Sequence, residues 1–286
     1  MLTCFREKRF DVRTRANALP RPSDLPDFAN PPLGEVVLGI QFDPPHGYQQ
    51  IRAGEVWALF RDAFPNVQEL PPLPPTFETF GLPQGPQLNF GFVTGASSNR
   101  FWFVSRDGDE LIQFQSDRLL HNWRKVGDQS NEYPRFDAIA AKFQDEARRL
   151  EHYFSGLQSQ ALVVRQCEIS YINHIGGSRG TEINPSDWLT FVSIPGTPPN
   201  DFACSFRRII HSEKGQPQGR LTCESVTAIE PSMQQLISLT LTARGVPDRP
   251  DVPSAIDFLG RGRDMIVRLF AEVTTDSAHK LWGRMR

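Results

Sequence analysis

The sequence lacks features that would direct it to a membrane or to nucleic acid. It has no run near the roughly 18 apolar residues of a membrane-spanning helix. Its first residues, MLTCFREKRFDVRTR, lack the apolar core of a signal peptide. Neither charge dominates, because 31 Lys and Arg face 33 Asp and Glu, and the pI is about 6.3. We therefore expect a cytoplasmic protein with no membrane partner and no overall field that attracts nucleic acid.

Motifs for cofactors, metals and nucleophiles are also missing. No GxGxxG or GxxxxGK[ST] segment leads from a strand into a helix, and no GxSxG turn is present. The six His and four Cys show no metal-ligand spacing, so a zinc site would need ligands from distant segments. These absences predict no cofactor, no metal and no catalytic residue, and they favour a non-catalytic protein.

The composition that remains is that of a globular protein with a large core. Hydrophobic residues make up 39% of the 286 residues and include 21 Phe and 5 Trp. Residues 1–32 are basic and then Pro-rich, which predicts a flexible tail; it is either a solvated extension or an arm that contacts phosphates. Residues 33–286 are expected to form a single domain.

The first half of this domain shows a strand, a short helix, further strands and a long helix. Alternating or helical periodicity and the turn DG at 107–108 place the elements. The expected order is strand 34–42, helix 51–64, a proline-rich ordered loop 65–86, strands near 87–93, at 100–105 and at 110–115, and helix 134–157.

The second half repeats this order without obvious sequence identity. The expected elements are strand 161–175, short helix 185–192, strands 201–211, 220–228 and 235–243, and helix 253–274. Two glycines in GRGRD at 260–264 predict a kink or a close packing contact in the last helix. The sequence thus predicts an α+β fold in which two βαβββα pseudo-repeats, 33–157 and 161–275, build one curved antiparallel sheet with its helices on one face.

The other face of such a sheet is expected to be polar. Gln113 and Gln115 share one face of their strand, and Glu168 and His174 share one face of theirs with Gln166 and Ser170. This polarity suits either ordinary solvation or a binding surface.

A charged and aromatic segment follows the second hairpin strand. In SDRLLHNWRK, residues 117–124 include Arg118, Asn122, Trp123 and Arg124, and Trp beside Arg is typical of a binding hot spot. The other interpretation is that Trp123 covers the core while Arg118 pairs with an acidic residue. The sequence leaves both open.

A resemblance to a known family rests on ELPPLPP, RFWFVSRDGDELIQFQSDR, NWRK, YPRF and QCEISYINHI. Over residues 31 to about 275 the chain resembles a family of uncharacterised bacterial proteins with a sporadic distribution among genomes. That resemblance implies no activity for any residue. The expected topology also resembles the duplicated saddle of TATA-box-binding proteins, a likeness of architecture alone.

We expect a non-catalytic binding protein that holds a protein partner or a small polar ligand on the polar sheet face and the 117–124 segment. One alternative is a nucleic-acid-associated accessory factor with a defence-related role, in which Arg118, Arg124, Arg207 and Arg208 contact phosphates; a second is a hydrolase using Glu168 and His174. Exposed sheet edges would also allow a homodimer. The candidate binding residues are Gln113, Gln115, Arg118, Asn122, Trp123, Arg124, Glu168 and His174.

Overall fold

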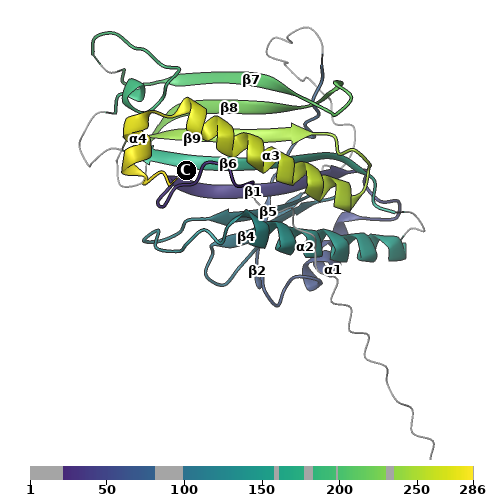
Figure 1. Ribbon diagram of the computed structural model, residues 1–286. Helices are drawn as coiled ribbons and strands as arrows, with labels where there is room; N and C mark the ends of the chain where they lie inside the picture. The colour runs from purple at the N-terminus through teal and green to yellow at the C-terminus, as the bar shows by residue number, and fades with distance from the viewer. Residues whose placement is uncertain are drawn as a thin grey trace, which may run out of the picture.

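The computed structural model of the protein describes residues 22–80, 99–157, 161–176, 183–197, 199–229 and 235–285. Its centre is one antiparallel sheet of nine strands in the order β2-β3-β4-β5-β1-β6-β9-β8-β7. The long helices α2 and α3 lie on the same side of this sheet (Figure 1). The fold is therefore α+β, as predicted.

The strands are short at the β2 edge and long around β6. Their bounds are β1 Leu33–Phe42, β2 Asn66–Leu70, β3 Arg100–Val104, β4 Glu110–Gln115, β5 Arg118–Arg124, β6 Val164–Gly176, β7 Ala203–His211, β8 Pro217–Ile229 and β9 Gln235–Gly245. The helices are α1 Ala53–Ala58, α2 Phe136–Leu157, α3 Val252–Val273 and α4 Asp276–Leu281, with 3₁₀ turns η1 Gln50–Arg52 and η2 Pro185–Asp187.

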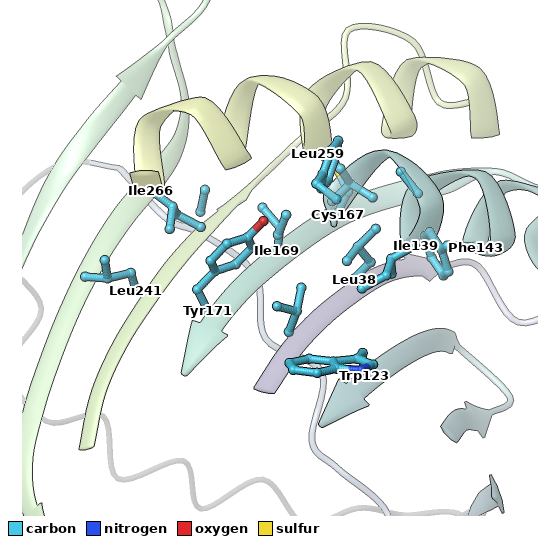
Figure 2. Packing of buried hydrophobic residues seen from close by; sticks show 14 of the residues in the cluster. Leu38, Trp123, Ile139, Phe143, Cys167, Ile169, Tyr171, Leu241, Leu259 and Ile266 are labelled. Carbon is cyan, nitrogen blue, oxygen red and sulfur yellow. The ribbon is translucent and has the colours of Figure 1, made fainter. Parts of the chain in front are cut away.

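The core lies between the sheet and the two long helices. Alternate residues of each central strand point to this side, as Leu38 does in β1 and Ile169 in β6, and both are fully buried. Phe143 of α2 and Ile266 of α3 come from the helical side at helical spacing and are also fully buried. Figure 2 shows these side chains filling the space between the helices and the strands. The removal of this apolar surface from water is the main stabilising term of the fold.

Helix α3 approaches the sheet most closely at Gly262. A Cβ atom there would lie 2.8 Å from Cγ2 of Ile169 and 3.0 Å from Cβ of Ala243, so only glycine fits. Gly260 has nothing within 4 Å of such an atom. The close packing contact predicted for GRGRD is confirmed, and Gly262 is the residue that makes it.

The predicted tail is too long at its C-terminal end. Leu25 is fully buried, and Phe28 lies edge-on to Phe270 with ring centroids 5.3 Å apart. A β-bridge joins Phe28 to Arg284. The end of this segment therefore packs against the C-terminal helices, because Phe28 finds its aromatic partners Phe270 and Trp282 there. Residues 1–21 lie outside the described residues.

Several predicted elements also need correction. The helix expected at 185–192 is only the turn η2, which Asn184 caps by accepting a hydrogen bond from the backbone of Ser186. The charged and aromatic segment 117–124, for which no strand was predicted, contains β5 and lies within the first half's sheet, between β4 and β1. The proline loop contributes the edge strand β2. The strand expected near 87–93 lies outside the described residues. None of the described helices combines the length and the apolarity needed to cross a membrane.

Candidate functional site

The polar face, by which we mean the side of the sheet opposite α2 and α3, holds all the predicted binding residues except Trp123. Directly paired residues of antiparallel strands point to the same side. Gln115 pairs with Arg118, and the alternation along β4 and β5 then adds Gln113, Asn122 and Arg124. Strand β1 pairs with β5 on one side and with β6 on the other, and these two registers place Glu168 and His174 of β6 on the same face.

Trp123 points to the helix side instead. It is 1% exposed, and its ring centroid lies 5.1 Å from that of Tyr133. Its neighbour at the next inward position, His121, is fully buried, with Nδ1 3.0 Å from both carboxylate oxygens of Glu146 in α2. Trp123 is therefore a core residue: of the two interpretations that the sequence left open, the structure supports the one in which Trp123 covers the core and Arg118 pairs with an acidic residue, here Asp117.

A transverse row of polar side chains crosses four adjacent strands of the polar face. Gln115 in β4, Arg118 in β5, Gln41 in β1 and Gln166 in β6 are direct cross-strand neighbours. The three glutamines are 6%, 8% and 1% exposed respectively. A buried primary amide needs hydrogen-bond partners, because each unsatisfied group costs about 1–3 kcal/mol. We call this set the glutamine row.

The partner of the glutamine row is the strap, residues 71–80, which follows β2 and crosses the polar face. Gln115 accepts a hydrogen bond from the backbone N–H of Leu73 at 2.9 Å and donates one to the Leu73 carbonyl at 3.0 Å. Gln41 binds Thr76 in the same two-sided way, at 3.3 and 3.1 Å. The strap atoms that each amide binds are thus main-chain N–H and C=O groups.

Gln166 continues the pattern one strand further on. Its Nε2 donates to the Thr76 carbonyl at 2.6 Å, and its Oε1 accepts from the N–H of Glu78 at 3.2 Å. The main chain of the strap is therefore held at Leu73 by β4, at Thr76 by β1 and β6, and at Glu78 by β6.

The spacing of these contacts follows from the geometry of the two partners. The strap begins Pro-Pro-Leu-Pro-Pro-Thr, a sequence that favours a polyproline II helix with three residues per turn and about 3.1 Å rise, or roughly 9.3 Å per turn. Leu73 and Thr76 are one turn apart and are the residues of this segment that carry an N–H. Gln115 and Gln41 stand two strands apart, roughly 9.6 Å at about 4.8 Å per strand. The two repeats match.

Charged groups fix the far end of the strap. Glu78 lies 2.8 Å from Nε of Arg220 and 3.6 Å from a terminal nitrogen of Arg244. Arg244 also pairs with Glu168 at 2.7 Å, and Arg220 donates to the carbonyl of Thr79. Glu168 is thus part of an ion network that anchors the strap over β9 and β8.

A second polar cluster lies beyond the glutamine row on β3, β4 and β5. The guanidinium carbons of Arg100 and Arg124 lie 5.5 and 6.0 Å from the ring centroid of Trp102. The side-chain oxygen of Gln113 accepts hydrogen bonds from the Trp102 indole at 2.9 Å and from Arg100 at 3.1 Å. Gln113 in turn donates to Asn122 at 2.9 Å. Trp102 is half-buried on the polar face. The role of an aromatic residue beside arginines, which the sequence suggested for Trp123, therefore belongs to Trp102.

Arg100 is held in a constrained environment. Burial, and to a smaller extent the charge of Arg118, lowers its pKa. Its Nε atom is buried and has no hydrogen-bond partner among the described residues. This cluster, defined by Arg100, Trp102, Gln113, Asn122 and Arg124, combines the residue types of a binding hot spot with donors fixed in place.

The structure does not bring together the pair suggested for a hydrolase. Glu168 and His174 are six residues apart on one strand, about 20 Å at roughly 3.3 Å per residue. His174 is exposed, and its ring covers Gly34, where an added Cβ would lie 2.7 Å from Nδ1. Acid–base partners must reach one substrate, so this pair cannot act as one.

The arginines suggested for phosphate contacts are partly neutralised by carboxylates. Arg118 is 6% exposed and bonds Asp117 with two nitrogens, at 3.0 and 3.1 Å. Arg208 pairs with Glu272 at 2.6 Å. These contacts weaken the argument for a nucleic-acid surface.

Within the described ranges, no three His, Cys, Asp or Glu side chains are grouped so as to hold a metal ion. Cys167 and Cys223 are buried, and burial raises the pKa of the Cys223 thiol to about 12. Cys4 lies outside the described residues.

Sequence reasoning missed Gln41 and Trp102. Both could have been found from alternation, because Gln41 follows Glu35 by an even number in β1, and Trp102 faces away from Phe101 and Phe103. The role of the strap had no local signal. Comparisons of the chain with protein-family models, with curated proteins and with solved structures found no match.

Proposed function

We propose that this chain is a non-catalytic binding protein that holds an extended polypeptide segment of a protein partner on the polar face of its sheet. The observation that carries the proposal is the glutamine row, which binds the main chain of the strap at Leu73 and Thr76 through both amide atoms. A surface that recognises backbone groups accepts many side-chain sequences, as in other strand-recognition modes. The strap then acts as a ligand in cis that a partner segment replaces.

The cluster around Trp102 supplies the contacts that give selectivity in this proposal. Its arginines and indole offer large contact area and directional donors next to the strap's path. A partner segment with a carboxylate or an aromatic ring at the matching position would gain affinity there. The backbone contacts would be shared by all ligands.

We also propose that the single nine-stranded sheet arises from an internal duplication of a βαβββα unit. The strand order supports this: reading outward from the β1–β6 pair, the first half gives β1, β5, β4, β3 and the second gives β6, β9, β8, β7. Each half ends in a long helix, α2 or α3. The first half adds β2 at its edge. Membership of the sporadically distributed bacterial family and the likeness to the TATA-box-binding saddle remain proposals of the same kind.

Binding of the strap sequence in trans tests the proposed function. The probe is a fluorescein-labelled synthetic peptide with the sequence of residues 69–80, ELPPLPPTFETF, measured by fluorescence anisotropy against the full chain. In the wild type the tethered strap competes at an effective concentration in the millimolar range, so we expect weak binding. In Glu78→Ala the protein's own strap loses its ion pairs while the peptide keeps them. We expect the peptide to bind this variant roughly tenfold more tightly, equivalent to about 1.4 kcal/mol.

Two further substitutions separate backbone recognition from unspecific adhesion. Adding Gln41→Leu to Glu78→Ala removes a two-sided amide contact and should abolish peptide binding. Gln144→Leu in α2, a half-buried glutamine on the helix side, is the matched control and should leave the affinity unchanged. If the peptide fails to bind Glu78→Ala, or binds the Gln41→Leu double variant equally well, the polar face is not a polypeptide-binding surface.

A further inference from the structure

A cavity on the helix side of the sheet, away from the polar face, has the chemistry of a ligand pocket. Its volume is about 70 Å³. Its walls come from the segment before β1, the start of α2, β6, β9 and α3; they include the apolar side chains Leu33, Phe136, Leu241, Ile266 and Phe270. Figure 2 shows Ile266 and Leu241 beside the ring of Tyr171 under α3. One water molecule, which is one non-hydrogen atom, needs about 10–15 Å³ of the volume measured in this way. The 70 Å³ of the cavity therefore holds roughly six non-hydrogen atoms.

A buried cation lines this cavity. Arg263 is 4% exposed, and its guanidinium carbon lies 4.8 Å from the ring centroid of Phe136. Its Nε atom lies 2.8 Å from Oδ1 of Asp264, but the angle is not that of a hydrogen bond, and within the described chain this nitrogen has no hydrogen-bond partner. A buried guanidinium with an unused donor is costly unless a further acceptor is bound.

Two tyrosine hydroxyls at the wall of the cavity can also hydrogen-bond to an acceptor bound beside Arg263. The hydroxyls of Tyr133 and Tyr171 lie 2.9 Å apart at the cavity wall. Burial raises the pKa of Tyr133 well above its usual value, while the charges of Arg263 and Arg135 act in the opposite direction. The Tyr133 hydroxyl therefore stays protonated and can donate a hydrogen bond.

The rim of the cavity carries a backbone conformation that non-glycine residues seldom adopt. Arg135 has φ +72° and pairs with Asp27 at 3.2 Å. Such left-handed residues cost about 1–3 kcal/mol and cluster at ligand sites. Arg135 and Arg263 line the cavity, and each has a carboxylate beside it, Asp27 for Arg135 and Asp264 for Arg263.

We infer that this cavity binds a small aliphatic carboxylate of about four carbons, with its oxygens on Arg263 and Tyr133 and its tail against the apolar wall. The buried guanidinium of Arg263, whose Nε donor has no hydrogen-bond partner among the described residues, and the Tyr133 hydroxyl favour the oxygen atoms of a carboxylate, because hydrogen bonds to an ionised acceptor are stronger than hydrogen bonds between neutral groups. The wall of Leu241, Ile266 and Phe270 excludes a fully hydrated ion such as phosphate, which has no apolar part to bury. The volume limits the tail to a short chain.

Butyrate is the probe that tests this inference, with butyramide as its neutral isostere and inorganic phosphate as the purely polar anion. The readouts are the melting temperature and the dissociation constant from ligand-observed NMR, both on the full chain. At about ten times the dissociation constant, butyrate should raise the melting temperature by about 2–3 °C. Butyramide and phosphate at the same concentration should not.

Substitutions locate the site. Arg263→Gln should weaken butyrate binding at least tenfold, and Tyr133→Phe should weaken it less. Arg261→Gln is the matched control, since Arg261 lies on the same helix but pairs with Asp248 at 3.0 Å outside the cavity. If Arg263→Gln does not fold, the comparison of butyrate with butyramide on the wild type decides alone. Equal effects of those two compounds, stronger binding of phosphate, or unchanged butyrate affinity in a folded Arg263→Gln would overturn the inference.

Discussion

The contact between α3 and the sheet gives a sharp test of the packing, because the helix carries two glycines in different surroundings. Gly262 faces the sheet and Gly260 faces open space. Replacement of either by alanine adds the same single methyl group to the same helix. The gain in helix propensity, about 0.5–1 kcal/mol, is then common to both variants.

The cost differs because the new methyl group meets different neighbours. At position 262 the added Cβ would lie 2.8 Å from Cγ2 of Ile169 and 3.0 Å from Cβ of Ala243. Neither atom is the end of a flexible chain, so the helix must move or the strands must shift. Overpacking of this kind costs about 1–3 kcal/mol. We expect Gly260→Ala to be more stable than Gly262→Ala by about that amount.

Urea denaturation followed by circular dichroism measures this difference in free energy, and the melting temperatures should differ by about 2–5 °C. The slope of the free energy with urea should be the same in both variants, since neither changes the surface exposed on unfolding. Equal stability of the two variants, or a more stable Gly262→Ala, would refute the close approach of α3 to β6 and β9.

Two further predictions concern a helix cap and a buried pair. Asp251→Ala should cost about 1 kcal/mol and Asp251→Asn much less, because Asp251 caps α3 by accepting a hydrogen bond from the N–H of Ser254 at 2.8 Å. This hydrogen bond lowers the pKa of Asp251 below its ordinary 3.8, so the stabilisation is present above that pH and is lost as the pH falls through the folded-state pKa. Urea denaturation at several pH values should therefore show that the difference in free energy of unfolding between the wild type and Asp251→Ala shrinks in acid. A difference that does not change with pH would contradict this. His121→Ala should destabilise the protein by about 1–3 kcal/mol by leaving the buried Glu146 carboxyl group without its hydrogen-bond partner, and Glu146→Gln, which can still hydrogen-bond to His121, should cost clearly less in the same assay. Equal losses would argue against a stabilising hydrogen bond between His121 and Glu146.

Alternation and helical periodicity were sufficient to predict most strands and both long helices. They failed where a side chain's partner is distant in sequence. In β5, the polar His121 points inward because Glu146 of α2 meets it, so RLLHNWR shows no clean apolar side. The same holds for Phe28, whose apolar partner Phe270 comes from the far end of the chain. Local patterns carry no information about such pairs.

The alternation of residues along single strands predicted the polar face, but it did not predict that the strap covers this face. Alternation gave Gln113, Gln115 and Glu168 their side of the sheet correctly. It could not show that a proline-rich loop returns over that side. Prolines erase periodicity, and the loop's partners include Gln166, 90 residues from Thr76, and Arg220, 141 residues from Thr79. The row itself becomes visible only when strand order and register are known.

Burial of the glutamine row bears on the choice between a solvated face and a binding face. Glutamines on a solvated face would be exposed, yet Gln166 is 1% exposed and Gln41 is 8% exposed. The amides of Gln115 and Gln41 avoid the cost of desolvation because the strap offers an N–H and a C=O together at Leu73 and again at Thr76, one polyproline turn later. Any ligand that displaces the strap must offer the same paired groups at about the same 9–10 Å repeat. The repeating main chain of an extended polypeptide meets this condition, whereas a phosphate backbone supplies acceptors without donors; we therefore infer that a partner on this face would be a protein rather than a nucleic acid.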